Sequence, residues 1–180
     1  MRLRVPLLGL VFTGLLLSVL AFRPEPVQEG TLIFLVRHAE RADDGLMTGE
    51  EDPHLSEAGY GRAEELATLL LDVGLTTIHS SDYIRTRETA APTADAAGLD
   101  VRIYNVRALE DFARELQATP GRHLVVGHSN STPELVAALG GDPHGEIQAM
   151  EYDRLYLLSI GPDGVDTVLL RFGEPFADGS

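Results

Sequence analysis

Two arginines and two histidines of this sequence lie just beyond predicted strands. Arg37 and His38 directly follow one apolar run, Arg85 comes shortly after a second, and His128 follows a third. Ligands of open α/β sheets bind beyond the carboxyl ends of the strands. An arginine presents a planar fork of donors that matches phosphate oxygens. A neutral histidine can attack phosphorus through one ring nitrogen. The four residues therefore indicate a site that binds and transfers a phosphoryl group.

Alternating strands and helices must position these side chains. Strands are expected over residues 31–36, 76–79, 101–106, 123–126, 155–160 and 165–172. Apolar residues at helical spacing predict one helix that ends at Gly74. Three further helices are expected over 84–97, from Leu109 to Leu116, and from Ser131 to Gly140. This alternation is typical of a mostly parallel sheet with helices on both faces. The predicted fold class is α/β, a three-layer α/β/α sandwich.

Two local features refine this prediction. Pro92 is expected to kink the helix over 84–97 or to split it in two, because proline lacks the N–H of a helix interior. Ser131 and Glu134 have the spacing of a capping box, with Pro133 in the first turn. The helix that they open directs free backbone N–H groups toward the predicted phosphate site, which favours an anion there.

Composition excludes several classes of chemistry. The 180 residues include no cysteine, which removes disulfides, thiolate nucleophiles and cysteine-ligated metals. All basic residues are arginine, so a Schiff-base lysine and a phosphate-loop lysine are absent as well. No His-Glu-x-x-His pattern occurs, and neither a metal nor an organic cofactor is expected. The net charge of −14 disfavours nucleic acid as a partner.

The N-terminus has the pattern of a targeting segment. Arg2 and Arg4 precede an uncharged, mostly apolar stretch over 5–22. Residues 1–22 are therefore predicted to be a signal peptide or an N-terminal membrane anchor. Residues 23–30 are expected to be a linker, and residues 31–180 the catalytic domain. Either form of leader predicts an extracytoplasmic location, and contact with a membrane is expected only through such an anchor.

Four motifs in order resemble those of the histidine phosphatase superfamily, also called the phosphoglycerate mutase-like family. They cover nearly all of residues 31–172. The motifs are Leu35-Val36-Arg37-His38-Ala39-Glu40, Leu55-Ser56-Glu57-Ala58-Gly59, Ser81-Asp82-Tyr83-Ile84-Arg85-Thr86-Arg87-Glu88-Thr89-Ala90 and Val126-Gly127-His128-Ser129-Asn130.

The resemblance implies a role for each motif residue. His38 would be the nucleophile that forms a phosphohistidine, and Arg37, Arg85 and His128 would bind the phosphoryl group. Asn130 is expected to contact the substrate. A glutamate after the third strand serves as proton donor in many members, and Glu110 is the best match in this sequence.

Other functions remain open at this level. A phosphoglycerate mutase-type phosphotransferase would use the same residues, and a non-catalytic phosphate-binding protein would share the pocket. Gly127-His128-Ser129-Asn130-Ser131 also resembles the nucleophile elbow of a serine hydrolase, with Ser129 as nucleophile. Hydrolysis of a small-molecule or protein phosphomonoester is the favoured function. Neither the substrate nor the oligomeric state follows from the sequence.

Overall fold

Strands and helices alternate as far as the last two strands, which form a hairpin. The computed structural model describes residues 30–44 and 52–177. The strands are β1 (Thr31–Arg37), β2 (Thr77–Ser80), β3 (Val101–Ile103), β4 (Arg122–Gly127), β5 (Arg154–Gly161) and β6 (Gly164–Arg171). The helices are α1 (Glu57–Leu70), α2 (Ile84–Ala97), α3 (Leu109–Ala118) and α4 (Ser131–Ala138).

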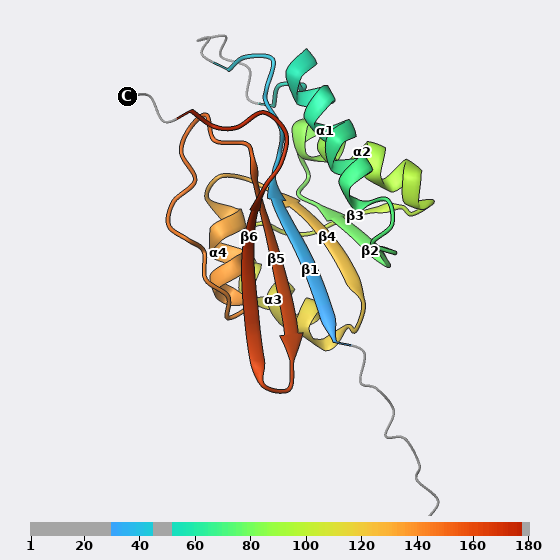
Figure 1. The fold of residues 1–180 in the computed structure, drawn as a ribbon, viewed down its shortest axis with the longest axis vertical. Helices are drawn as coiled ribbons and strands as arrows, with labels where there is room; N and C mark the ends of the chain where they lie inside the picture. Colours follow the sequence, from blue (N-terminus) through green and yellow to red (C-terminus); the bar gives the residue numbers. More distant parts are fainter. Residues whose placement is uncertain (1–29, 45–51, 178–180) are drawn as a thin grey trace, which may run out of the picture.

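One sheet, with the strand order β3-β2-β4-β1-β5-β6, holds the molecule together (Figure 1). Strands β3, β2, β4 and β1 pair in parallel, whereas β5 pairs antiparallel with both β1 and β6. The mostly parallel sheet predicted from the sequence is therefore confirmed. Because β4 lies between β1 and β2, the three strand ends that carry the predicted site residues are neighbours.

Side chains of β1 alternate between two cores, one on each face of the sheet. Ile33 and Leu35 pack in a core with residues of α3 and α4. Phe34 and Val36 pack in a second core with residues of α1 and α2. Burial of apolar area on both faces is the main favourable contribution to folding. The arrangement confirms the three-layer α/β/α sandwich, with one pair of helices on each face.

Some predicted boundaries differ from the observed ones. Helix α1 ends at Leu70, before the predicted stop at Gly74, and Leu69 is half exposed instead of buried. Strand β3 ends at Ile103 although the apolar pattern continues to Val106. Helix α2 has the predicted bounds and continues through Pro92 without a break.

The predicted capping box at Ser131 is wrong. The N-cap residue of α4 is Asn130, and its side chain makes no capping hydrogen bond. The Ser131 hydroxyl instead accepts a hydrogen bond of 3.0 Å from the backbone N–H of His128. The Ser131 hydroxyl therefore bonds within the turn after β4. This hydrogen bond competes with the capping hydrogen bond that the sequence predicts.

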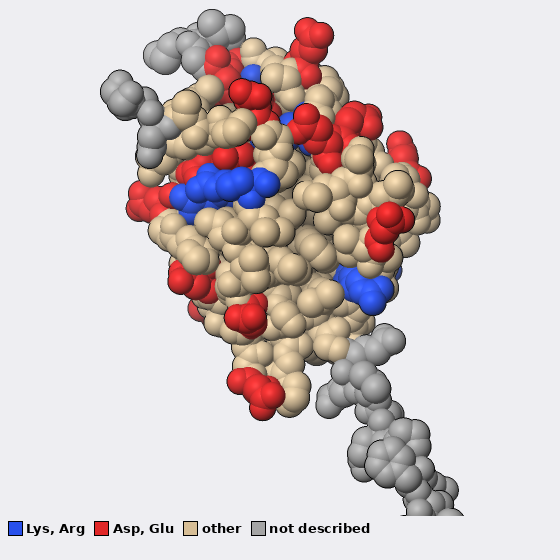
Figure 2. Space-filling model, in the orientation of Figure 1, with Lys and Arg blue, Asp and Glu red and all other residues tan. Residues whose placement is uncertain are grey.

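On the face shown in Figure 2, acidic side chains are widely spread, whereas arginines gather at a few places. No helix in the described part of the chain is long and apolar enough to cross a bilayer. The predicted leader over 1–22, and the predicted linker over 23–30 except for its last residue, lie outside the described residues. The leader and the extracytoplasmic location therefore stay predictions.

Candidate active site

The ends of β1, β2 and β4 lead into one cleft with a volume of about 590 Å³. Parallel pairing aligns Arg37 of β1 with Gly127 of β4, and Ser80 of β2 with Val126 of β4. This register brings the residues that follow the three strands to the same edge of the sheet. The predicted site residues that line the cleft are Arg37, His38, Arg85, His128 and Asn130.

The loop after β1 is held against α1. The Leu55-Ser56-Glu57-Ala58-Gly59 segment supplies this contact, because the backbone N–H of Ser56 donates to the carbonyl of Glu40 at 2.9 Å. A Cβ on Gly59 would lie 2.2 Å from the same carbonyl oxygen. Only glycine permits this close approach, so the motif fixes the backbone that follows His38.

His38 is held through one ring nitrogen, and no hydrogen-bond partner of the other is found among residues 30–44 and 52–177. The side chain is 4% exposed, and Nδ1 lies 2.8 Å from the carbonyl oxygen of Ala39. A carbonyl can only accept, so Nδ1 carries the proton and Nε2 keeps its lone pair. Burial lowers the pKa of His38 to about 2, and the charges of Arg37 and Arg85 act in the same direction. The ring is thus neutral, as a nucleophile requires.

Arg37 is oriented by the loop that precedes β5. Its Nη1 donates hydrogen bonds of 2.9 Å to the carbonyl oxygens of Gln148 and Glu151. Its Nε is buried and has no acceptor within the described residues. A buried donor without a partner is costly, so this edge of the guanidinium is suited to an anion that enters the cleft.

Arg85 has a similar arrangement on the other side of the cleft. Its Nη1 donates to Oδ1 of Asp52 at 3.1 Å, and its guanidinium lies over the ring of Tyr83. The Nε of Arg85 is also buried without an acceptor in the described part of the chain. Burial lowers the pKa of both Arg37 and Arg85. An anion between them would favour their charged forms.

His128 faces His38 and contacts the start of α2. Its Nε2 lies 2.9 Å from the hydroxyl of Ser81. The Ser81 hydroxyl donates its proton to Oγ1 of Thr86, so it accepts from Nε2–H of His128, and Nδ1 keeps its lone pair. Burial, followed by the charges of Arg85 and Arg37, lowers the pKa of His128 to about 4.

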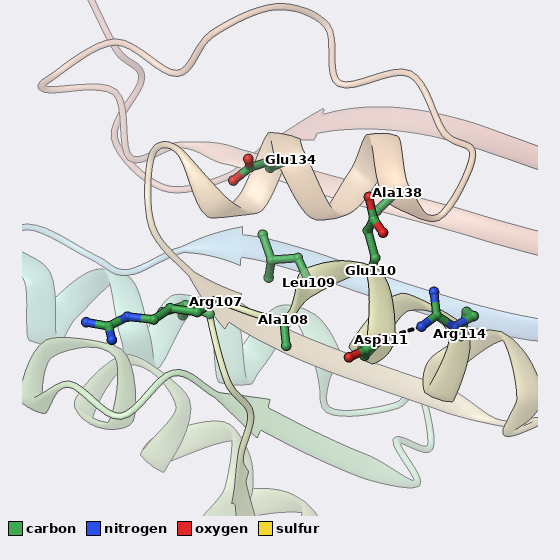
Figure 3. Close-up of a pocket in the computed structure, with 9 residues that line it drawn as sticks. Arg107, Ala108, Leu109, Glu110, Asp111, Arg114, Glu134 and Ala138 are labelled. Atoms are coloured by element: carbon green, nitrogen blue, oxygen red, sulfur yellow. Dashed lines mark hydrogen bonds and ion pairs between the residues drawn. The ribbon is translucent and has the colours of Figure 1, made fainter.

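Glu110 lies apart from this cleft. It lines a neighbouring groove beside α4, where its carboxylate points toward Ala138 (Figure 3). Arg107 lines both hollows, but in Figure 3 its side chain extends away from Glu110. The role of Glu110 as proton donor therefore stays a prediction that the geometry of the cleft does not support.

Ser129 and Asn130 both lie at the mouth of the cleft. A nucleophilic serine needs a base within hydrogen-bond reach. Among the described residues, no hydrogen bond joins the Ser129 hydroxyl to a histidine, and Nε2 of His128 faces Ser81 instead. The side chain of Asn130 makes no capping bond, which leaves its amide available to a ligand.

No group of three or more histidine, cysteine or carboxylate side chains in residues 30–44 and 52–177 is arranged to hold a metal ion. The positive charge of the cleft comes instead from arginines. Besides Arg37 and Arg85, Arg41 and Arg107 contribute to its lining.

Tyr152 is a residue of the site that sequence analysis missed. Its ring lies 4.0 Å from Cζ of Arg37, and its centroid is 5.9 Å from that of His38. It is 115 positions after Arg37, in a segment that matches no motif. Tyr83, the aromatic neighbour of Arg85, lies inside a motif and could have been noted from its position.

Comparisons with known proteins identify a family for this chain. The sequence profile of the histidine phosphatase superfamily (branch 1) matches residues 33–106. A probable phosphoglycerate mutase, GpmB of Escherichia coli, is 38% identical over 127 residues. That match covers 68% of this chain and 59% of the relative, so the chain spans about three fifths of the length of this relative.

Solved structures share the fold at lower sequence identity. The mycobacterial glucosyl-3-phosphoglycerate phosphatase has a TM-score of 0.62 at 18% identity, over 79% of this chain and 98% of that one. The putative phosphohistidine phosphatase SixA of Agrobacterium tumefaciens has a TM-score of 0.59 at 23% identity, over 78% and 97%. A tungstate complex of a protein histidine phosphatase SixA has a TM-score of 0.62 at 16% identity, over 78% and 96%.

Proposed function

Because the chain belongs to the histidine phosphatase superfamily, we propose that it hydrolyses phosphomonoesters through a phosphohistidine intermediate on His38. One observation carries the proposal. The neutral, buried His38 lines the same cleft as Arg37 and Arg85, whose buried Nε atoms lack acceptors among the described residues. A phosphoryl group supplies the acceptors for both arginines and the electrophile for the histidine.

The reaction has two steps. Nε2 of His38 attacks phosphorus, the bond from phosphorus to the ester oxygen breaks, and the leaving oxygen takes a proton from a general acid or from solvent. Water then attacks phosphorus and returns one proton to that acid or to solvent, the P–N bond breaks, and inorganic phosphate leaves with His38 neutral again. Arg37 and Arg85 stabilise negative charge on the phosphoryl oxygens throughout, and His128 joins them once the bound dianion raises its pKa and Nδ1 takes up a proton. The positive charge of these groups takes the place of a metal ion, so we propose that no cofactor is required.

The physiological substrate is proposed only as a class, a small-molecule or protein phosphomonoester. Of the similar proteins, the phosphatase of a phosphorylated sugar derivative acts on this class by its name, whereas the protein or putative phosphohistidine phosphatases act by name on a phosphoryl group bonded to a histidine nitrogen. A mutase remains the second candidate, because GpmB is named a probable phosphoglycerate mutase. Incubation with 3-phosphoglycerate separates the two functions: a phosphatase releases inorganic phosphate, and a mutase forms an isomer.

We also propose that residues 1–22 direct the catalytic domain out of the cytoplasm, as a cleaved signal or as an anchor. The basic start and the apolar stretch after it support this proposal. Fusion of residues 1–30 to a reporter that works only after export is expected to give an active reporter. An inactive, cytoplasmic fusion would refute the location.

Covalent labelling tests the central proposal. The protein is mixed with 32P-labelled phosphomonoester and quenched in alkali, because phosphohistidine is labile in acid. We expect label on the parent and on Ser129→Ala, and none on His38→Ala. His144→Asn is a matched control at an exposed histidine with φ 52°, a conformation that asparagine tolerates. Label that persists on His38→Ala, or turnover lost only in Ser129→Ala, would overturn the assignment. Absence of label and turnover in the parent would favour a non-catalytic phosphate-binding protein.

A further inference from the structure

Tyr152 is held in place at both ends of its side chain. Its ring lies under the guanidinium of Arg37, with 4.0 Å from Cζ to the ring centroid. Its hydroxyl donates a hydrogen bond of 2.6 Å to Oδ2 of Asp44. The residue is 3% exposed, so the contact with Arg37 is largely shielded from water. Cation–π attraction is strongest under such desolvated conditions.

The same loop also fixes one edge of Arg37. The carbonyl oxygens of Gln148 and Glu151 both accept from Nη1. The carboxylate of Glu151 is buried and accepts from the backbone N–H of Gln148 and from Nε of Arg154. One face of the guanidinium thus contacts Tyr152 and Nη1 is bonded to two carbonyls, whereas Nε has no acceptor among the described residues and is left for an anion.

An equivalent arrangement exists on the opposite side of the cleft. Tyr83 lies 4.5 Å from Cζ of Arg85, and its ring meets that of His128 edge to face with 4.8 Å between centroids. Each pair of one arginine and one histidine therefore contacts one tyrosine. Tyr83 lies at the start of α2, two positions before Arg85. Tyr152 is 115 positions after Arg37 in the sequence.

We propose that Tyr152 is a positioning residue for phosphoryl binding, which holds the guanidinium of Arg37 through its aromatic face. This inference rests on the proposed function, because it requires Arg37 to bind a phosphoryl group. The hydroxyl of Tyr152 anchors the ring to Asp44, and the ring orients the arginine. An arginine that is already oriented loses less side-chain entropy when the anion arrives.

A series of nearly isosteric rings at position 152 tests the proposal without emptying the site. Tyr152 is replaced by phenylalanine and by phenylalanines with one, two and three ring fluorines, which weaken the negative face of the ring. Affinity for tungstate, an oxyanion that resembles phosphate, is measured for each protein together with KM and kcat for a phosphomonoester. We expect tungstate affinity to fall stepwise with fluorination, to about tenfold below the phenylalanine protein, with a parallel rise in KM. Tyr152→Phe itself is expected to stay within about threefold of the parent.

Tyr104 provides the matched control. It is buried and stacks on Phe112 at 4.5 Å, and no guanidinium contact of its ring is found among the described residues. The fluorinated series at position 104 should leave tungstate affinity unchanged. A flat series at position 152, or equal losses at both positions, would overturn the inference. If the parent neither binds tungstate nor hydrolyses any phosphomonoester, the proposed function itself fails, which is a distinct result.

Discussion

The imidazole rings of His38 and His128 meet edge to face across the cleft, with 5.4 Å between centroids and 68° between planes. Two protonated rings at this distance would repel each other strongly in a buried site that already holds Arg37 and Arg85. Burial and these charges lower the pKa of His38 to about 2 and that of His128 to about 4. The free enzyme therefore keeps both rings neutral at any pH well above 4.

This relationship predicts the titration of the two rings. We expect the Cε1–H resonances of His38 and His128 to stay unchanged in NMR spectra between pH 8 and pH 5. His38→Gln and His128→Gln variants assign the two signals. An ordinary histidine titrates near pH 6.5. A midpoint near that value for either ring would contradict the electrostatic account of the cleft.

Replacement of Arg85 by lysine is expected to lower kcat/KM by roughly 100-fold, because an ammonium cannot reproduce the planar fork of a guanidinium. Arg87→Lys is the matched control. Arg87 is two positions further along α2 and pairs with Asp82 at the surface, so its replacement should change kcat/KM less than twofold. Steady-state kinetics with one phosphomonoester measures both. Equal losses in the two variants would show that any arginine change in α2 impairs the enzyme.

Activity is expected to survive excess chelator. Arginines supply the positive charge of the cleft, and no metal-binding cluster was found in the part of the chain that the structure describes. Initial rates are measured after dialysis against EDTA, with and without added divalent ions. Complete loss that Mg²⁺, Mn²⁺ or Zn²⁺ restores would refute the mechanism through His38 alone.

Local sequence signals predicted much of the fold. Helix α2 has the expected bounds, since Gly98 adopts φ 65° and ends it as a left-handed C-cap. The alternation of Ile33 and Leu35 with Phe34 and Val36 divides β1 between two cores. The prediction failed where one local hydrogen bond replaced another, as when the Ser131 hydroxyl accepted from the N–H of His128, three positions before it, instead of capping α4.

Long-range contacts explain why the site was only partly predicted. His38, Arg85 and His128 each lie within a motif just beyond a strand, so their convergence follows from parallel pairing. Tyr152 reaches Arg37 only because the loop before β5 folds back over the end of β1. No periodicity or spacing encodes that contact. Asp52 is similar, since its carboxylate accepts from the N–H of Ile84 and from Arg85, more than 30 positions away.

Glu110→Gln tests the predicted proton donor. If Glu110 protonates the leaving oxygen, hydrolysis of an alkyl phosphate should fall at least tenfold, consistent with the usual effect of general acid catalysis. Hydrolysis of 4-nitrophenyl phosphate should hardly change, because its leaving group needs no proton. Asp111→Asn is the control, since Asp111 pairs with Arg114 on the same turn of α3. Unchanged rates with both substrates would remove Glu110 from the mechanism, in agreement with its place in the neighbouring groove.

A histidine pair away from the active site is expected to make the fold sensitive to acid. His79 and His123 are buried and share the hydroxyl of Thr77, at 3.0 Å and 2.6 Å. Burial lowers the pKa of His79 to about 4 and also lowers that of His123. Between pH 6.5 and 4 the unfolded chain therefore binds more protons than the folded one, so stability falls as the pH falls. Protonation of each histidine lowers the free energy of unfolding by about 1.4 kcal/mol for every unit between its pKa values in the folded and unfolded states.

Urea unfolding at pH 7, 5.5 and 4.5 should show a smaller loss of stability with acid in His79→Gln than in the parent. Equal pH dependence in the two proteins would show that His79 does not contribute to acid unfolding.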